Sequence, residues 1–322
     1  MQKYVVKREE SGQTLEKYIK KLFPLMPLSL LYKTFRKKDI KVNGHWEKEK
    51  FVINPDDEVS IYIDNDLLDS FKSDSTIIPS DEIKERVVYE DENVLIVNKP
   101  RGMLVQDDGK DLGKSLDKLV LQYLVFKGEY DPDVENAFTP GPAHRLDRNT
   151  SGLVVFGKNI ETLQYLFEIF KDHTKINKHY YTLVVGEVLE DGVIEAPLKK
   201  NPETGNVTVT SLKNGGKRAK TLYHVLQRFD GYTLLDVSLI TGRTHQIRAH
   251  LSYIGHPVVG DSRYGDFDTN KYFEKTFGFK NQFLEAYELS FNDVGGPLKK
   301  LNGEIITIDL EKEYFNILNS LE

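Results

Sequence analysis

The sequence predicts an α+β protein in which a small N-terminal unit precedes a larger domain with a central mixed, largely antiparallel sheet. Short apolar strands near 87–89 and 94–97 flank a polar turn, as the strands of a hairpin do. Farther along, strands alternate with helices, and this combination favours a mixed sheet over a purely parallel one. An Asp- and Ser-rich stretch at 64–82 has the composition of an acidic linker between the two parts.

The N-terminal unit, residues 1–63, is predicted to hold two helices and a hairpin. Ser29 is expected to cap the second helix, which ends in the basic run Arg36-Lys37-Lys38. Asn43-Gly44 then predicts a hairpin turn after a short strand. The unit carries 13 Lys/Arg and 9 Asp/Glu, a net charge of +4, although the whole chain carries −6. A basic surface for a polyanion is one interpretation, and a charged, solvated helix end is the other.

The larger domain, residues 83–322, is predicted to alternate buried strands with amphipathic helices. The expected strands lie at 87–89, 94–97, 153–156, 182–186, 232–240, 283–291 and 305–310, and the expected helices at 116–124, 159–170 and 245–251, with a short helix closing the chain.

Composition limits the class of protein. The chain has 322 residues, 39% of them hydrophobic, and no cysteine, which excludes disulfides and thiolate zinc sites. The first residues lack the apolar run of a signal peptide, and no apolar run reaches the ~20 residues that span a bilayer. A soluble, cytoplasmic protein is therefore expected.

The stretch 144–156 draws attention because a carboxylate stands at the mouth of a strand. Asp147 lies between Arg145 and Arg148, and a Thr-Ser-Gly turn then leads into an apolar strand. Loop residues that a rigid strand supports often carry chemistry. Asp147 is accordingly a candidate catalytic group, with a structural salt bridge as the alternative. Gly152 is interpreted as a turn residue that connects the motif to the strand after it.

A second polar segment follows the strand at 232–240. Arg243 lies at a turn, while His245 and Arg248 are three residues apart and share a face of the helix that begins there. The free N–H groups of that helix could also receive an anion. A structural ion-pair cluster is the alternative here, and an ordinary strand aromatic is the alternative for Tyr180. Several such polar elements at strand ends favour one shared cleft.

Three other kinds of site, a phosphate-binding loop, a serine hydrolase triad and a metal site, are not supported by the sequence. Residues 152–158 fit Gly-x-x-x-x-Gly-Lys, but the intervening residues are strand-like and Asn159 replaces the magnesium-binding Ser/Thr. Ser151 has no Gly-x-Ser-x-Gly elbow around it. His245 and His250 are five apart and lie on different helix faces, so no metal site is expected.

Six motifs in order resemble the RluA/RluC/RluD-type family of pseudouridine synthases. They are Val97-Asn-Lys-Pro100-Arg-Gly102, His144-Arg-Leu-Asp147-Arg-Asn-Thr-Ser-Gly, Lys178-His-Tyr180, Gly216-Lys-Arg-Ala219-Lys-Thr221, Thr241-Gly-Arg-Thr-His-Gln-Ile-Arg248 and Gly255-His-Pro257-Val-Val-Gly-Asp261. Leu284-Glu285-Ala286 stands where the family usually has Leu-His-Ala. The N-terminal unit resembles an alpha-L RNA-binding domain of a ribosomal small-subunit protein. It departs from that pattern at Ser29-Leu30, where Ser-Arg is frequent.

The resemblance implies a pseudouridine synthase fold with a cleft, and an enzyme that isomerises uridine to pseudouridine in RNA without cofactor or metal. Asp147 matches the catalytic aspartate, which acts on the sugar as a nucleophile or as a base. Arg248 matches the arginine that pairs with it, and Tyr180 the aromatic that stacks on the target base. Because the ribose carbon is inaccessible in a duplex, the base must be flipped out, and Arg145 matches the residue that fills its place.

The resemblance also implies a set of RNA contacts, with ribosomal RNA of the large subunit as the expected substrate and a monomer as the expected state. The candidate contacts are Arg36, Lys37, Lys38, Arg145, Lys178, Lys217, Arg218, Arg243 and His245. Two alternatives stay open at this point. One is a non-catalytic RNA-binding ribosome-assembly factor on the same fold, and the other is a hydrolase built on Ser151.

Overall fold

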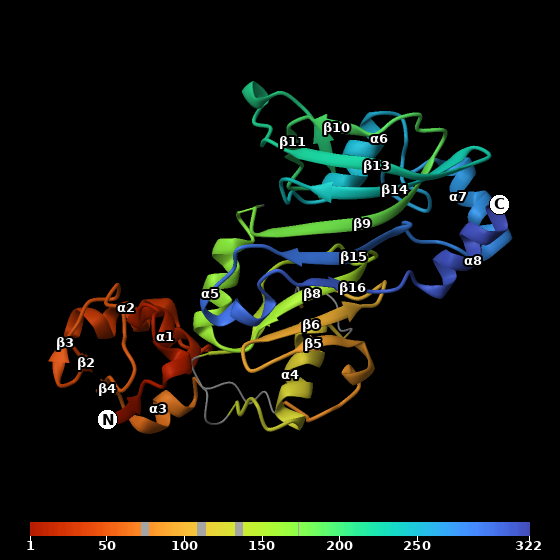
Figure 1. The fold of residues 1–322 in the computed structure, drawn as a ribbon. Coiled ribbons are helices and arrows are strands. Elements are labelled where there is room, and N and C mark those ends of the chain that lie inside the picture. Colours follow the sequence, from red (N-terminus) through yellow and green to blue (C-terminus); the bar gives the residue numbers. More distant parts are fainter. Residues whose placement is uncertain (72–76, 108–113, 133–137, 173) are drawn as a thin grey trace.

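The computed structural model describes residues 1–71, 77–107, 114–132, 138–172 and 174–322. It shows a small N-terminal unit beside a larger domain with one long curved sheet (Figure 1). The predicted α+β class is confirmed. Within the described residues, no helix is both long and apolar enough to cross a membrane.

The N-terminal unit folds around its own core and a four-stranded sheet of order β1-β4-β2-β3. Its elements are β1 (Gln2–Val5), a 3-10 turn (Arg8–Glu10), α1 (Leu15–Leu22), α2 (Leu28–Lys37), β2 (Ile40–Val42), β3 (His45–Trp46), β4 (Glu58–Ile61) and α3 (Asn65–Asp69). The predicted hairpin turn is present, since Asn43 and Gly44 join β2 to β3 with φ of 50° and 81°.

Two details of this unit differ from the sequence interpretation. Ser29 does not cap α2, because the helix already begins at Leu28 and Pro27 occupies the cap position. Proline at a helix start loses no bond, since the first N–H groups have no partner within the helix. The stretch at 64–82 begins with α3, whose Leu68 is buried in the core of the N-terminal unit. Residues 72–76 of that stretch lie outside the described residues.

The large sheet runs in the order β10-β13-β14-β9-β15-β8-β6-β5, with β16 paired to β15 and β7 paired to β8. Its strands are β5 (Val87–Glu90), β6 (Val94–Lys99), β7 (Gly141–Pro142), β8 (Ser151–Gly157), β9 (Ile176–Val185), β10 (Gly192–Glu195), β13 (Lys220–Phe229), β14 (Tyr232–Leu239), β15 (Leu284–Phe291) and β16 (Ile305–Thr307). Strands β11 (Leu198–Lys200) and β12 (Val207–Val209) form a separate pair. Every recorded pairing is antiparallel except β15 with β8, so the sheet is mixed and largely antiparallel as predicted.

The helices cover both faces of this sheet, which explains why its central strands are apolar on both sides. Leu95 and Val97 of β6 face the core that α4 (Leu116–Phe126) and α6 (Gln246–Tyr253) help to form. Val94 and Ile96 face the opposite core, against α5 (Ile160–Ile169). Two further helices, α7 (Phe267–Phe277) and α8 (Lys312–Leu321), pack around a third cluster near β9. The remaining 3-10 turns are Lys84–Arg86, Leu212–Asn214 and Gly296–Leu301.

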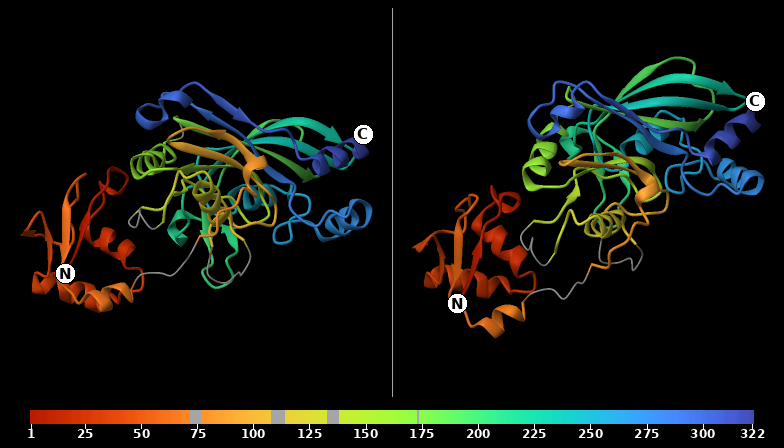
Figure 2. Two further views of the ribbon diagram at one scale, coloured as in Figure 1. Left: turned by 90° about the horizontal axis from the view of Figure 1, so that it is seen from below. Right: turned by 60° about the horizontal axis from the view of Figure 1, so that its bottom comes forward.

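Figure 2 shows the N-terminal unit beside the larger domain, next to α5. In the contact between them, the Nε2 of Gln164 donates to the carbonyl of Gly12 at 3.3 Å. The ammonium of Lys21 lies 5.6 Å from the ring centre of Phe138.

Gly152 lies where β8 pairs with β15. It lies within β8 rather than at a turn, with φ of 113°, and pairs with Ala286 of β15. A Cβ at this position would lie 2.2 Å from the carbonyl oxygen of Ala286. Side chains essentially never tolerate such an approach, so the glycine here is a packing requirement. The sequence interpretation of Gly152 as a turn was therefore wrong.

We expect Gly152→Ala to lower the free energy of unfolding by about 3 kcal/mol or more, through left-handed strain together with overpacking. Gly102→Ala is the matched control, because Gly102 also has positive φ (80°) but has open space where the added methyl group would lie. That control should lose only about 1–2 kcal/mol. Urea unfolding of both variants measures the difference, and equal losses would contradict the clash.

Candidate active site

A buried lysine, Lys99, holds the loop that carries Asp147 by a hydrogen bond to the carbonyl of Arg148. Lys99, at the end of β6, is fully buried and donates to the carbonyls of Pro100, Met103 and Arg148 at 2.9–3.0 Å. Burial lowers the pKa of Lys99 to about 7, partly opposed by the nearby Asp147 charge. The ammonium therefore ties the residue after Asp147 to the loop at 100–103. Thr150 closes the turn by donating its N–H to the carbonyl of Asp147 at 3.1 Å.

Arg248 on α6 supplies the countercharge for Asp147. Its Nη1 donates to the Oδ2 of Asp147 at 2.8 Å, across 101 residues of sequence. The same guanidinium donates through Nε and Nη2 to both oxygens of Asp261, at 2.6 and 2.8 Å. Asp261 is thus a bidentate partner that fixes the plane of the arginine. Neither sequence neighbour, Arg145 or Arg148, forms the recorded ion pair with Asp147.

The electrostatics of this group depend on Arg248. Burial alone would raise the pKa of Asp261, but the hydrogen bonds and charge of Arg248 hold that pKa below its ordinary value. For Arg248, burial alone would lower the pKa, but Asp261 and Asp147 raise it above its ordinary value. The arginine is buried and Asp261 fully so, whereas the Asp147 side chain keeps 26% of its surface exposed. Asp147 is therefore the open end of a buried carboxylate–arginine–carboxylate chain.

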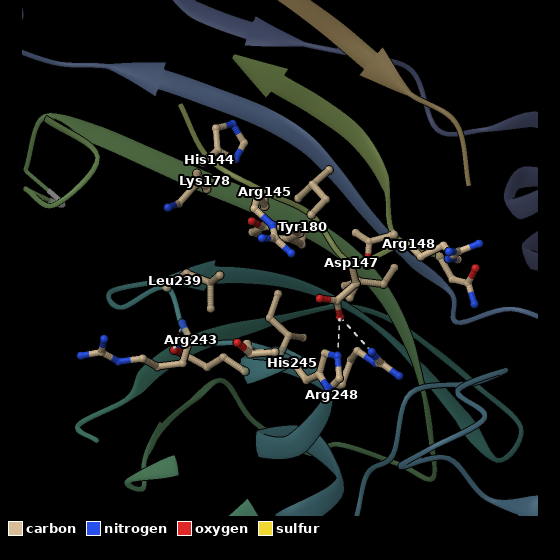
Figure 3. Close-up of a pocket in the computed structure, with 18 of the residues that line it drawn as sticks. His144, Arg145, Asp147, Arg148, Lys178, Tyr180, Leu239, Arg243, His245 and Arg248 are labelled. Atoms are coloured by element: carbon tan, nitrogen blue, oxygen red, sulfur yellow. Dashed lines mark hydrogen bonds and ion pairs between the residues drawn. The ribbon is translucent and has the colours of Figure 1, made fainter. Parts of the chain in front are cut away.

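The two oxygens of Asp147 are not equivalent. Both recorded contacts of the carboxylate run to Oδ2, from Arg248 at 2.8 Å and from the Nε2 of His245 at 3.9 Å. Among the described residues, Oδ1 has no recorded hydrogen bond or ion pair. Figure 3 shows one oxygen directed toward Arg248 and His245 and the other toward the open cavity. Oδ1 is thus the oxygen that a bound molecule would meet.

Tyr180 and Lys178 extend the site along β9. They are two residues apart on one strand, so both side chains point to the same face, toward the cavity. Burial and the neighbouring Asp147 charge raise the pKa of the Tyr180 hydroxyl. The Lys178 ammonium lies 5.3 Å from the ring centre of Phe170, and within the described part of the chain it has no recorded hydrogen bond or ion pair. Burial without a counterion lowers the pKa of Lys178 to about 8.

These side chains line one cavity of about 1260 Å³. From the candidates that the sequence singled out, the structure brings together Arg145, Asp147, Lys178, Tyr180, Arg243, His245 and Arg248. Lys217 and Arg218 do not line the cavity, although the Arg218 carbonyl accepts a hydrogen bond from the Nε of Arg243 at 3.1 Å. Arg36, Lys37 and Lys38 are exposed at the end of α2 in the N-terminal unit.

Sequence reasoning assigned no role to several residues that matter here. Lys99 and Asp261 belong to two of the six motifs and Tyr264 to the polar loop that follows, but only the tertiary contacts reveal what each one supports. Lys171, Lys200 and Arg263 add further positive charge to the cavity wall. Within the described ranges, no three His, Cys, Asp or Glu side chains are grouped as a metal would require.

The geometry does not support the hydrolase alternative. Ser151 is fully buried at the start of β8, where its hydroxyl donates to Glu285 at 3.2 Å. His144 accepts the N–H of Val155 through Nε2 at 3.2 Å, and burial lowers its pKa to about 3. A histidine whose Nε2 lone pair is already engaged cannot act as the base for a serine.

A carboxylate held by a buried arginine in a deep cationic cavity, on a long mixed sheet, defines an enzyme that acts on a polyanion. Residues 93–253 match the family model described as RNA pseudouridylate synthase, and the chain belongs to this family. It is an RNA pseudouridine synthase, which converts uridine to pseudouridine within RNA, and the non-catalytic alternative is not favoured.

The similarity extends over nearly the whole chain. An uncharacterized RNA pseudouridine synthase of Mycoplasma capricolum is 33% identical and covers 95% of this chain and 97% of its own length. Ribosomal large subunit pseudouridine synthase C of Vibrio cholerae is 31% identical, covering 89% of this chain and 87% of its own. The solved structure of human RNA pseudouridylate synthase domain containing 4 shares the fold, with a TM-score of 0.58 at 20% identity, over 74% of this chain and 94% of that one.

Proposed function

We propose that this enzyme modifies uridines of large-subunit ribosomal RNA, with the Asp147 carboxylate acting on the ribose of a flipped-out uridine. The observation that carries the proposal is the asymmetry of Asp147, whose Oδ2 is held by Arg248 while Oδ1 faces the cavity. An ionised carboxylate with one free oxygen can attack a sugar carbon or remove a proton from the sugar. Arg248 supplies the countercharge at 2.8 Å from Oδ2.

The reaction is an isomerisation, so its atoms balance within the nucleotide. The bond from ribose C1′ to N1 breaks, the uracil turns, and C1′ bonds to C5. The hydrogen on C5 leaves as a proton, and N1 gains one. Asp147 serves either as the nucleophile at C1′ or as the base at the sugar, and both roles need the same ionised Oδ1.

Tyr180 is proposed as the surface on which the uracil lies. Its ring lines the cavity from β9, on the same strand face as Lys178. A planar ring recognises the face of a pyrimidine without reading its edge, so the base can turn during the reaction and stay in contact. With its pKa raised, the hydroxyl stays protonated and adds no charge beside Asp147.

The cavity is proposed to hold the target nucleotide outside the RNA stack. Arg145 is exposed beside Asp147 and would occupy the vacated place. Lys178 and Arg243 face the cavity from β9 and from the turn after β14, where phosphates on either side of the flipped nucleotide would pass. Among the described residues Lys178 has no recorded counterion, and a phosphate of the RNA would supply one.

The choice of large-subunit ribosomal RNA rests on two supports. The first is the relatives, including one from Vibrio cholerae that is named as a ribosomal large subunit synthase and covers most of this chain. The second is the proposed alpha-L nature of residues 1–63, with Arg36, Lys37 and Lys38 exposed at the end of α2. A monomer working in the cytoplasm stays a prediction.

Mapping pseudouridine across total RNA, in strains with and without this gene, tests the proposal. The expected result is one or more large-subunit ribosomal sites that disappear without the gene and return with the wild-type gene. Loss of sites only in transfer RNA would overturn the substrate assignment. Restoration by Asp147→Asn would overturn the role of the carboxylate.

The basic end of α2 yields a separate prediction about affinity. Replacing Arg36, Lys37 and Lys38 together by Gln should weaken RNA binding by about tenfold or more at physiological salt. It should also reduce the steepness of the plot of log binding constant against log salt concentration by about 2. This follows because each lost phosphate contact contributes roughly 0.7–0.9 to that slope. The maximal rate should stay near wild type, because these side chains lie outside the cavity.

The matched control removes the same charge elsewhere. Lys271, Lys275 and Lys299 are exposed on the larger domain and do not line the cavity. Their triple Gln variant should leave the salt slope unchanged. If both triple variants behave alike, the effect comes from net charge, and the N-terminal unit does not contact the substrate.

A further inference from the structure

His245 is held in an unusual backbone conformation at the entrance to α6. Its φ of 51° and ψ of 24° are left-handed, a region that costs a non-glycine residue about 1–2 kcal/mol. Gln246 fixes the turn before it, accepting through Oε1 from the Thr241 hydroxyl at 2.8 Å and from the Arg243 N–H at 3.1 Å. The other non-glycine residues with positive φ in the described chain, Lys38, Asn43, Asp56 and Asp293, do not line the cavity.

The strained backbone directs the imidazole between Tyr264 and Asp147. Its Nδ1 lies 2.9 Å from the Tyr264 hydroxyl, and its Nε2 lies 3.9 Å from the Oδ2 of Asp147. The Tyr264 oxygen already accepts the N–H of Val207 at 2.8 Å, so its own proton is available for Nδ1. This network assigns the ring proton to Nε2, on the side of Asp147.

The charges around His245 favour a neutral ring. Burial lowers the pKa of His245, and the positive charges of Arg248 and Arg263 act in the same direction, while Asp147 and Asp261 oppose them. Tyr264 faces the ring from the loop after Asp261 and stays protonated, because burial raises its pKa. At neutral pH the ring thus presents an uncharged N–H to the carboxylate, and Arg248 alone provides the countercharge.

We propose that His245 is a positioning residue for the reaction, whose Nε2–H closes onto the Oδ2 of Asp147 when RNA is bound and keeps Oδ1 as the reactive oxygen. The proposal rests on the proposed function of Asp147. It replaces the expectation from sequence that His245 contacts RNA. At 3.9 Å the two atoms are too far apart for a hydrogen bond in the free enzyme, and hydrogen bonds of catalytic groups commonly tighten only in the complex. Tyr264 acts behind His245 by fixing its tautomer.

The test compares three substitutions under single-turnover conditions. The substrate is the RNA fragment found by mapping, labelled with tritium at uridine C5, since that hydrogen is lost in the reaction. His245→Ala should lower the rate constant about 100-fold and leave the RNA dissociation constant within about threefold, as expected when a reacting group is misplaced. His245→Gln should recover to within about tenfold of wild type, because its amide can donate from nearly the position of Nε2. Tyr264→Phe should lower the rate about tenfold.

The pH profile separates positioning from a structural role. In the wild type, protonation of His245 at low pH adds a positive charge beside Asp147 and weakens it as a nucleophile or base. That contribution to the acid limb should be absent in His245→Gln. His224→Gln is the control, because His224 is exposed at Asp191 and does not line the cavity. Its profile should overlay that of the wild type.

A wild-type rate constant with weakened RNA binding in His245→Ala would overturn the inference, because it would make His245 an RNA contact. Equal impairment of the His245→Gln and His245→Ala variants would also overturn it. If His245→Ala does not fold, the Gln and Phe variants still decide the question. Asp147→Asn in the same assay distinguishes the two proposals. Turnover by that variant would refute the proposed function, whereas an inactive Asp147→Asn beside a fully active His245→Ala would refute only this inference.

Discussion

Asp147→Asn is expected to leave no detectable conversion of uridine, while RNA binding stays within about tenfold of wild type. An amide cannot ionise, so it neither attacks the ribose nor removes its proton at a useful rate. The substitution removes one negative charge and no positive one, so attraction for phosphate does not fall. Tritium release under single turnover measures the rate, and filter binding on the same RNA measures the affinity.

The folded state should survive this change. Arg248 keeps its bidentate contact with Asp261 when the charge of Asp147 is lost. Asp147 is partly exposed, so little desolvation is at stake. The free energy of unfolding should therefore change by about 1 kcal/mol or less. Asp230→Asn, at the exposed turn between β13 and β14, is the control, and it should keep full activity. Residual turnover by Asp147→Asn above that of a blank would remove Asp147 from the chemistry.

Arg248→Met should be the most damaging of these substitutions for stability, and it should also lower turnover. It leaves the fully buried Asp261 without its charged partner, with only the N–H groups of Arg263 and Tyr264 still donating to it, which costs about 3–5 kcal/mol. It also removes the hydrogen bond that holds the Oδ2 of Asp147, so turnover should fall. Urea unfolding and single-turnover tritium release measure the two effects separately.

The pH dependence of stability has a definite sign. In the wild type the pKa of Asp261 is held below its ordinary value, so its contribution is present above the unfolded pKa and is lost as the pH falls through the folded one. In Arg248→Met, burial is the main influence on Asp261 and favours its protonated form. Lowering the pH protonates Asp261, so the cost of burying its charge falls. The gap in unfolding free energy between wild type and Arg248→Met should therefore narrow as the pH falls from about 7 toward about 4. A gap that stays constant over this range would contradict the role assigned to Asp261.

The double variant Arg248→Met/Asp261→Asn separates stability from catalysis. It removes both members of the buried pair, so much of the lost stability should return. Turnover should not return, because Asp147 still lacks its partner. Recovery of both properties would mean that Arg248 matters only for folding.

The sequence predicted the members of the site better than their contacts. Asp147, Tyr180 and Arg248 could be named because each belongs to a compact motif, and the structure places all three around one cavity. Asp261 ends another motif, but its role depends on a turn that brings it under Arg248, and no local pattern encodes that. Lys99 is similar, since its three carbonyl partners come from two separate loops.

Backbone details were predicted least well. Gly152 resembled a turn glycine because it follows Thr-Ser, but the close approach of Ala286 from a strand more than a hundred residues later is what requires it. Ser29 resembled a cap, yet Pro27 and Leu28 begin the helix sooner. The left-handed backbone of His245 and its contact with Tyr264 could not be read from the sequence either. In each example the deciding partner is distant in sequence or is a dihedral angle.

The position of β15 has a consequence for how the protein is made. This strand lies between β8 and β9, the strands that support Asp147 and carry Tyr180, and those two do not pair directly with each other. During translation, β9 ends at Val185 and β8 at Gly157, well before β15 begins at Leu284. Until then no strand connects β8 to β9 within the sheet. A nascent chain should therefore remain inactive, and its apolar strand edges would be exposed to chaperones. The enzyme should thus become competent for RNA only after β15 has been synthesised and has paired with both strands.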